Sequence, residues 1–276
     1  MRSLRTLGAA AGVVVIMAVG ALPAAAQPPT YTWHRQTLWK QSVTTDPATG
    51  KNVTTCYRLP AVVKTSNDVL LAFAERRNRN DCASVRLVYS DDHGASWRIG
   101  ATATYDKFVL KLGEQTLVER TDGGILVFAR NGVVPDQTSV HGLARATSSD
   151  GGESFDGDFR ADDAVTAPPT HPALLRQRWN GGPYTRILLS APATPKTGNN
   201  PVGMNVRSSF DEGTTWRHHD GAAGNAGIRI DADHAGYSDM TLAGNGAIGV
   251  LYEAGSARFR DEIRWNWFWE SAIGLP

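Results

Sequence analysis

The segment Ser90–Trp97 (SDDHGASW) follows the pattern Ser-x-Asp-x-Gly-x-Ser/Thr-aromatic. The chain repeats this pattern at Ser148–Phe155 (SSDGGESF) and Ser209–Trp216 (SFDEGTTW), so the starts lie 58 and 61 residues apart. In such a turn the Asp accepts backbone N–H bonds, the Gly takes a conformation that a side chain forbids, and the aromatic ring packs beneath the hairpin. The pattern therefore predicts three hairpin turns whose aspartates are structural rather than catalytic or metal-binding.

Short alternating or apolar runs surround these turns. Strands are expected before the turns at 85–89, 141–147 and 203–208, and elsewhere at 69–74, 115–118, 125–129, 186–190, 247–252 and 263–269. Self-similar hairpins at a long regular period favour an all-β propeller over a sandwich. No Pro/Gly-rich linker divides residues 27–276, so we expect one domain there. A further hypothesis is that 33–39 supplies the strand that closes the ring against the C-terminal blade.

Composition and charge limit the classes of function. The chain has 276 residues, 41% of them hydrophobic, and a formal net charge of +1. It can bury a full-sized core, but it offers no electrostatic argument for nucleic acid, which needs a clustered basic surface. The seven histidines lack metal-ligand spacing with acidic or cysteine partners, so neither a metal nor a cofactor is predicted. The alternation of Trp265, Trp267 and Trp269 predicts packing between blades rather than a sugar platform.

The N-terminus has the features of an export signal. Arg2 and Arg5 form a positive region, 7–22 is an uninterrupted apolar stretch, and 24–26 (AAA) gives a small-residue cleavage site. A membrane anchor is the alternative, but the stretch is short for a span of about 20 residues. We therefore predict a signal peptide at 1–26 and a secreted, extracellular mature chain with no membrane segment.

The chain has two cysteines: Cys56 lies beside Arg58, and Cys82 lies beside Asp81. An oxidising destination favours a disulfide between them over two free thiols, because exported free thiols are a liability.

Three arginines, Arg58, Arg130 and Arg207, lie in separate strand-like segments. A circular fold can aim side chains from distant strands at one point. A guanidinium matches a carboxylate with two parallel hydrogen bonds and stays charged at any working pH. A lone arginine of this kind is better explained as a surface charge at a strand end. Three in matching contexts predict a site for an acidic sugar.

The segment 57–60 (YRLP) is similar to the Phe/Tyr-Arg-Ile/Leu-Pro motif of the bacterial sialidases (neuraminidases), and the three repeated turns resemble the Asp-boxes of that family. The match runs through most of the mature chain. The turns alone are unspecific, because other propellers carry them, whereas their combination with the arginine motif is much more specific. The resemblance implies a retaining exo-glycosidase on a six-bladed β-propeller that acts on sialylated glycans.

The same resemblance implies roles for individual residues. Arg58, Arg130 and Arg207 resemble the triad that holds the sialic-acid carboxylate. Glu253, in 251–255 (LYEAG), is similar to the carboxylate that orients the first arginine.

Three further residues match the family's catalytic positions. Tyr237, in GYSDM, looks like the nucleophile, and Glu114, in GEQTLVE, looks like the glutamate that partners it. Asp81 looks like the acid/base. A solvated turn aspartate is the alternative for Asp81, because the neighbouring arginines at 76, 77 and 79 would lower its pKa and oppose an acid role.

The chain departs from the family in length. Arg58 and Glu114 are only 56 positions apart, whereas family members commonly have enough chain there for additional blades. Counting the expected strands gives about sixteen, nearer four blades than six.

The sequence thus favours a secreted, monomeric exo-α-sialidase of the retaining type. Two alternatives stay open: a hydrolase of a related 2-keto acid sugar such as Kdn or Kdo, and a shortened propeller that binds sialic acid without turnover.

Overall fold

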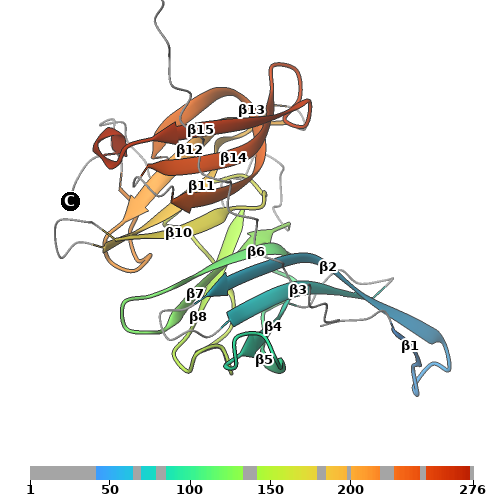
Figure 1. The fold of residues 1–276 in the computed structure, drawn as a ribbon. Coiled ribbons are helices and arrows are strands. Elements are labelled where there is room, and N and C mark those ends of the chain that lie inside the picture. The colour runs from blue at the N-terminus through green and yellow to red at the C-terminus, as the bar shows by residue number, and fades with distance from the viewer. Residues whose placement is uncertain are drawn as a thin grey trace, which may run out of the picture. The chain divides into compact units, whose positions relative to one another are not determined.

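The computed structural model describes residues 42–64, 70–78, 85–132, 142–178, 185–197, 200–217, 227–242 and 247–273, which form three antiparallel sheets (Figure 1). All of these residues belong to one compact unit, Leu38–Pro276. The all-β prediction is confirmed, because the described part contains fifteen strands and one short 3-10 helix, η1 (Glu270–Ile273). None of its helices is long and apolar enough to cross a membrane. The predicted signal peptide and the predicted strand at 33–39 lie outside the described residues.

The strands pair in chain order within each sheet. The first sheet contains β1 (Ser42–Thr45), β2 (Asn52–Lys64), β3 (Leu70–Asn78), β4 (Val85–Ser90) and β5 (Arg98–Thr102). The second contains β6 (Leu112–Glu119), β7 (Ile125–Asn131), β8 (Leu143–Ser148) and β9 (Arg160–Ala161). The third contains β10 (Ala173–Arg178), β11 (Thr185–Thr197), β12 (Asn200–Ser209), β13 (Ile228–Leu242), β14 (Ile248–Gly255) and β15 (Glu262–Phe268).

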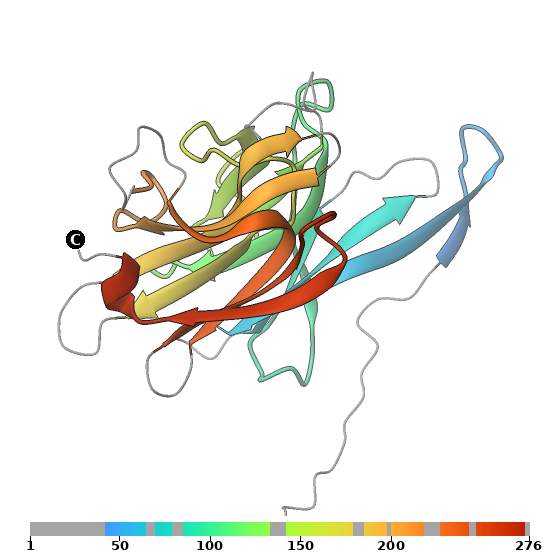
Figure 2. The same cartoon turned by 90° about the horizontal axis from the view of Figure 1, so that it is seen from above.

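Every predicted strand that falls within the described residues overlaps one of these elements. Their grouping differs from four equal blades, because β10 to β15 form a single six-stranded sheet, which curls (Figures 1 and 2). The cause is β13, which has 15 residues and pairs with both β12 and β14. The number of strands alone therefore does not predict how the strands are divided among the sheets.

Strand β7 shows why the sheets stack on one another. Its side chains alternate between two faces: Ile125 and Val127 belong to one core cluster, and Leu126 and Phe128 belong to the next. The first cluster includes residues of β4 and β5, whereas the second includes residues of β10 and β11. The middle sheet is thus buried on both faces, which explains why β7 is a continuous apolar run rather than an alternating one.

The three repeated turns have the geometry that their sequence predicts. In the third, the Asp211 carboxylate accepts hydrogen bonds from Thr215 N at 2.8 Å and from Ser209 Oγ at 2.8 Å, and Gly213 N donates to Ser209 Oγ at 2.8 Å. The same bonds recur around Asp92 and Asp150. The structural interpretation of these aspartates is confirmed.

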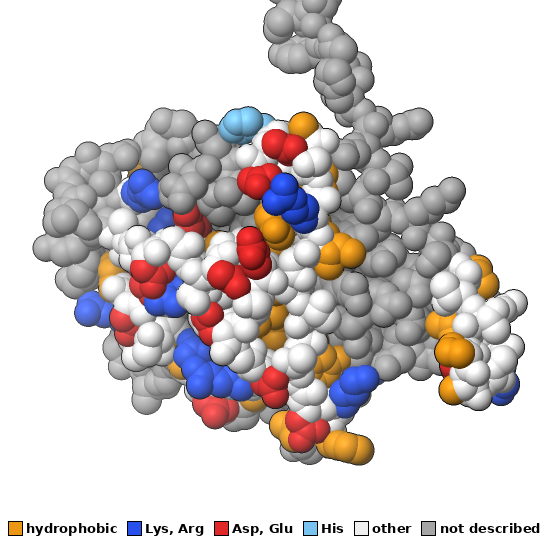
Figure 3. Space-filling model, turned by 90° about the horizontal axis from the view of Figure 1, so that it is seen from below, with side chains coloured by type: hydrophobic (Ala, Val, Ile, Leu, Met, Phe, Trp, Pro, Cys, Tyr) orange, Lys and Arg blue, Asp and Glu red, His pale blue; other side chains and the backbone are white. Residues whose placement is uncertain are grey.

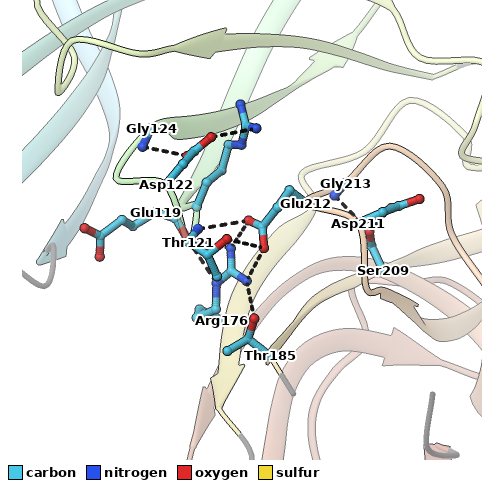
Figure 4. A network of polar contacts seen from close by, with 11 residues as sticks. Glu119, Thr121, Asp122, Gly124, Arg176, Thr185, Ser209, Asp211, Glu212 and Gly213 are labelled. Atoms are coloured by element: carbon cyan, nitrogen blue, oxygen red, sulfur yellow. Dashed lines mark hydrogen bonds and ion pairs between the residues drawn. The ribbon is translucent and has the colours of Figure 1, made fainter. Parts of the chain in front are cut away.

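The third turn also joins two sheets. Glu212, which has a left-handed φ of 60°, forms an ion pair with Arg176 of β10 (Figure 4). Its carboxylate also accepts hydrogen bonds from the backbone N and the hydroxyl of Thr121, at 3.2 and 3.1 Å, and Thr121 follows β6. Arg176 Nε donates in turn to the carbonyl of Glu119 at 3.1 Å. This network fixes the edge of the third sheet against the second.

Two surface features bear on the predictions from the sequence. On the face shown in Figure 3, acidic and basic side chains are interspersed, as expected for a chain of near-neutral charge. The predicted packing of the tryptophan stripe between blades is not seen in the described part of the chain. Strand β15 is the edge of its sheet, and Trp265, Trp267 and Trp269 are 52%, 56% and 47% exposed.

Gly213, in the third turn, provides a test of how closely that turn packs on Leu126 of β7. Gly213 (φ 85°) and Gly123 (φ 83°) both have left-handed backbones, but a Cβ on Gly213 would lie 2.4 Å from Leu126 Cδ2, and a Cβ on Gly123 would meet nothing within 4 Å. Gly123→Ala should cost about 1–2 kcal/mol of unfolding free energy from its backbone alone. Gly213→Ala should cost a further ~1–3 kcal/mol, because Leu126 must move within a packed core. Urea unfolding of both variants measures the difference, and equal losses would contradict the packing described.

Candidate active site

A cavity of about 340 Å³ opens where β7 of the second sheet faces β12, β13 and β14 of the third. It contains basic, acidic, phenolic and apolar side chains. Its lining residues are Arg130, Pro169, Thr170, Pro201, Gly236, Tyr237, Glu253, Phe259 and Arg260.

Three polar side chains meet at this cavity. The Tyr237 hydroxyl donates a hydrogen bond of 2.5 Å to Glu114 Oε1. Arg130 Nη1 donates to both Glu114 oxygens, at 3.1 and 3.3 Å, and to the Tyr237 hydroxyl oxygen at 3.1 Å. Glu114 lies on β6, Arg130 on β7 and Tyr237 on β13. The structure therefore brings together three of the residues that the sequence singled out, over a separation of 123 positions.

Irregularities in the strands position two of these side chains. Between β6 and β7 the register shifts from Leu112↔Asn131 to Gln115↔Ala129, which leaves one extra residue at 113–114. Between β13 and β14 it shifts from Ala235↔Ala254 to Ser238↔Tyr252, which leaves one extra residue at 236–237. An extra residue bends the strand and re-aims a side chain. Both members of the Tyr237–Glu114 pair thus lie on β-bulges.

Gly236 is required at the second bulge for steric reasons. A Cβ at this position would lie 2.4 Å from the Phe259 ring and 2.6 Å from Glu253 Oε2. The absence of a side chain lets both groups approach the backbone next to Tyr237. Glu253 Oε2 also accepts a hydrogen bond of 3.4 Å from the Tyr237 backbone N.

Glu114 is set up as an anion. Its side chain is buried, and burial opposes ionisation, but the hydrogen bond from Tyr237 and the charge of Arg130 outweigh this cost and lower the pKa of Glu114 below 4.5. The carboxylate is therefore ionised at neutral pH.

Tyr237 is set up as a neutral phenol. Burial, together with the hydrogen bond to Glu114 and the charge of that carboxylate, raises the pKa of Tyr237 to about 12. Since the phenol and the carboxylate share one short hydrogen bond, Glu114 is placed to take the phenolic proton when Tyr237 reacts.

Two residues that the sequence analysis did not select also belong to the site. The His171 ring lies 5.6 Å from the Tyr237 ring in an edge-on arrangement, and its Nε2 is 3.3 Å from the carbonyl of Gln115. Thr170 lines the cavity, is 2% exposed, and its hydroxyl has no hydrogen-bond partner in the described part of the chain. Neither residue lies in a motif, so no pattern in the sequence pointed to them.

Arg207 does not lie at the cavity, where the predicted arginine triad would place it. Its side chain is fully buried, and its guanidinium donates to the backbone carbonyls of Ala191 at 3.0 Å, Thr166 at 2.6 Å and Pro192 at 3.2 Å. It does not line the cavity. The expected convergence of Arg130 and Arg207 is therefore corrected: in this structure Arg207 bonds to the backbone inside the core.

The remaining predicted residues are described in part or not at all. Arg58 lies on β2 opposite Glu75, just before a register shift at 59–60, and β2 contacts β6. Cys56 is also on β2. Asp81 and Cys82 lie outside the described residues, so the acid/base and the disulfide stay predictions. In the described ranges, no group of three or more His, Cys, Asp or Glu side chains could hold a metal ion.

Comparison with curated proteins finds relatives of similar sequence. The chain is 28% identical over 193 residues to a sialidase of Micromonospora viridifaciens, which covers 68% of this chain and 26% of that protein. The chain thus spans about a quarter of the length of this relative. No protein-family model matches.

Solved structures show the same fold. The chain is similar to the intramolecular trans-sialidase of Ruminococcus gnavus in complex with oseltamivir carboxylate, with a TM-score of 0.57, 19% identity and coverage of 78% of this chain and 43% of that one. The NanB sialidase of Streptococcus pneumoniae gives a TM-score of 0.58, 20% identity and coverage of 77% and 31%. The prediction of a sialidase-type β-propeller fold is confirmed.

The Arg130–Glu114 ion pair gives a pH-dependent prediction. A carboxylate with a lowered pKa contributes stability that is complete above its unfolded value of 4.5 and is lost as the pH falls through the folded value. Arg130→Met leaves Glu114 without its cation and should cost about 1–3 kcal/mol at pH 7. The deficit should shrink towards pH 4 as Glu114 takes up a proton in the variant.

Urea unfolding of wild type and variant at both pH values measures this. Arg98→Met is the control, because Arg98 pairs with Asp91 at 3.4 Å on the surface and such pairs contribute little. A deficit that is the same at pH 7 and pH 4 would show that Glu114 is not stabilised by Arg130.

Proposed function

We propose that this chain, whose sequence relative and fold support a sialidase-family assignment, is a retaining exo-α-sialidase that removes terminal sialic acid from glycoconjugates. The observation that carries the proposal is the short hydrogen bond from Tyr237 to Glu114, with Arg130 bonded to both groups. It supplies a nucleophile, its base and a cation in one cavity.

The chemistry of the substrate favours this arrangement. A sialoside is a ketoside whose carboxylate sits on the carbon that reacts, so an anionic nucleophile would be repelled as it approached. A phenol avoids the repulsion if its proton leaves during the attack. Tyr237, with a pKa of about 12, stays neutral until Glu114 accepts that proton. Sialidases with a tyrosine nucleophile are a known exception to the scheme of two carboxylates.

In the first step the Tyr237 oxygen forms a bond to the anomeric carbon, the bond from that carbon to the leaving-group oxygen breaks, and the phenolic proton passes to Glu114. The leaving oxygen needs a proton from an acid, and we assign this role to Asp81. In the second step water, activated by Asp81, displaces Tyr237, which recovers its proton from Glu114. Two displacements at one carbon give retention of configuration.

Among the described residues, Arg130 is a cation that bonds to the Tyr237 hydroxyl oxygen. We propose that it also binds the carboxylate of the sugar. Its side chain is about a third exposed while Nη1 bonds to Glu114 and Tyr237, and we propose that the other nitrogens of the guanidinium meet the ligand. We retain Arg58 as a second carboxylate ligand and Glu253 as the residue that orients it, on the grounds given by the sequence.

The setting of the reaction is part of the proposal. The export pattern at residues 1–26 supports an extracellular location, where sialylated glycoproteins and glycolipids are displayed. Recognition of a 2-keto acid carboxylate also fits Kdn and Kdo glycosides, so a panel of the three glycosides distinguishes these substrates.

Replacement of the nucleophile tests the proposal. Tyr237→Phe should lower kcat on a 4-methylumbelliferyl sialoside by more than about 10³-fold, because the attacking oxygen is removed. Tyr252→Phe is a matched control: Tyr252 donates to the Asp231 carboxylate at 2.8 Å, just as Tyr237 does to Glu114, but it does not line the cavity. It should retain activity. Wild-type activity in both variants would exclude Tyr237 as the nucleophile. Binding of a sialoside by the wild-type chain without product release would favour a non-catalytic propeller.

A further inference from the structure

With Arg207 in the core, the cavity contains two cations among the residues that the structure describes, Arg130 and Arg260. Arg130 is committed in part to Glu114 and Tyr237. Arg260 is exposed, and no described residue forms an ion pair or hydrogen bond with it. A cation that lines a cavity and has no anionic partner in the described part of the chain is available for an anionic ligand.

The turn that carries Arg260 is held in place. It joins β14 to β15, and Arg258 N donates to Asp261 Oδ2 at 3.0 Å while Asp261 N donates to the Arg258 carbonyl at 3.3 Å. A Cβ on Gly255, the last residue of β14, would lie 2.3 Å from the Arg258 carbonyl oxygen, so the turn folds back closely on the strand.

Phe259 connects this turn to the nucleophile. Its ring occupies the space that Gly236 leaves open, directly before Tyr237. The Arg260 guanidinium lies 5.4 Å from the centroid of the same ring, within the range of a cation–π contact. The aromatic ring therefore supports the guanidinium at the cavity and restricts where it can point.

A second observation indicates that a ligand belongs here. Thr170 also lines the cavity, and its hydroxyl is buried and has no hydrogen-bond partner in the described ranges. Buried polar groups are normally satisfied, so an unsatisfied hydroxyl in a residue of the cavity wall indicates a polar partner that the described residues do not supply.

We propose that Arg260 binds the carboxylate of the sugar together with Arg130, in the role that the sequence predicted for Arg207. The inference rests on the proposed function, and it names the residue that recognises the acidic group. Arg260 is a binding residue that discriminates acidic from neutral sugars, and it takes no part in proton transfer.

The test compares binding of an acid with binding of its neutral form. The probes are 2-deoxy-2,3-didehydro-N-acetylneuraminic acid and its methyl ester, titrated into the full chain by calorimetry. Arg260→Gln should weaken binding of the acid about 10- to 100-fold, since one charge-assisted contact is lost, and should change binding of the ester much less. Arg260→Lys should restore part of the affinity for the acid.

Arg258→Gln is the matched control, because Arg258 belongs to the same turn and does not line the cavity. It should bind both probes as wild type does. Wild-type affinity of Arg260→Gln for the acid would overturn the inference, and so would an equal loss for acid and ester, which would indicate altered packing on Phe259. If Tyr237→Phe abolishes turnover while Arg260→Gln binds normally, only this inference fails. If Arg260→Gln shows the expected loss while Tyr237→Phe stays active, only the catalytic proposal fails.

Discussion

The hydrogen bond between Tyr237 and Glu114 is the interaction on which the account of this protein depends. It joins a strand of the third sheet to a strand of the second, and so it exists only if the two sheets stack in the register observed. The hydrogen bond from Tyr237 and the charge of Arg130 together lower the pKa of the buried Glu114 and keep it ionised against the cost of burial. A neutral phenol and a carboxylate base in contact are what attack on a carboxylate-bearing carbon requires.

The fold supplies this contact with two kinds of feature. Continuous apolar runs such as that of β7 are buried on both faces and stack the sheets, while the Arg176–Glu212 network joins the second and third at their edge. Local irregularities then aim the side chains: Glu114 and Tyr237 both lie on β-bulges. In regular strands the side chains alternate between the two faces of the sheet, and a bulge changes that alternation locally. The site therefore depends on two departures from regular strand geometry.

The sequence predicted what local chemistry or a motif determines. The repeated turns were predictable because Asp211 and its counterparts bond within their own eight residues, and Glu114 and Tyr237 were found through family motifs. Arg207 was misplaced because β12 is buried on both faces: Val206 and Arg207 are both fully buried, and a strand residue's side cannot be read from the residue alone. Arg260 was missed because it lies in a turn without a motif, and only the packing of Phe259 on Gly236 brings it to the cavity. The six-stranded sheet escaped prediction because pairing of β13 with both neighbours is a long-range property.

The most direct test is to trap the covalent intermediate. A 2,3-difluorinated sialic acid carries a good leaving group at the anomeric carbon, and its second fluorine withdraws electrons and slows release from the enzyme. After incubation and proteolysis, mass spectrometry should find the sugar attached to the peptide that contains Tyr237, and no adduct should form in the Tyr237→Phe variant. Attachment to Glu114 or another carboxylate, or no adduct from a chain that hydrolyses sialosides, would contradict the role assigned to the phenol.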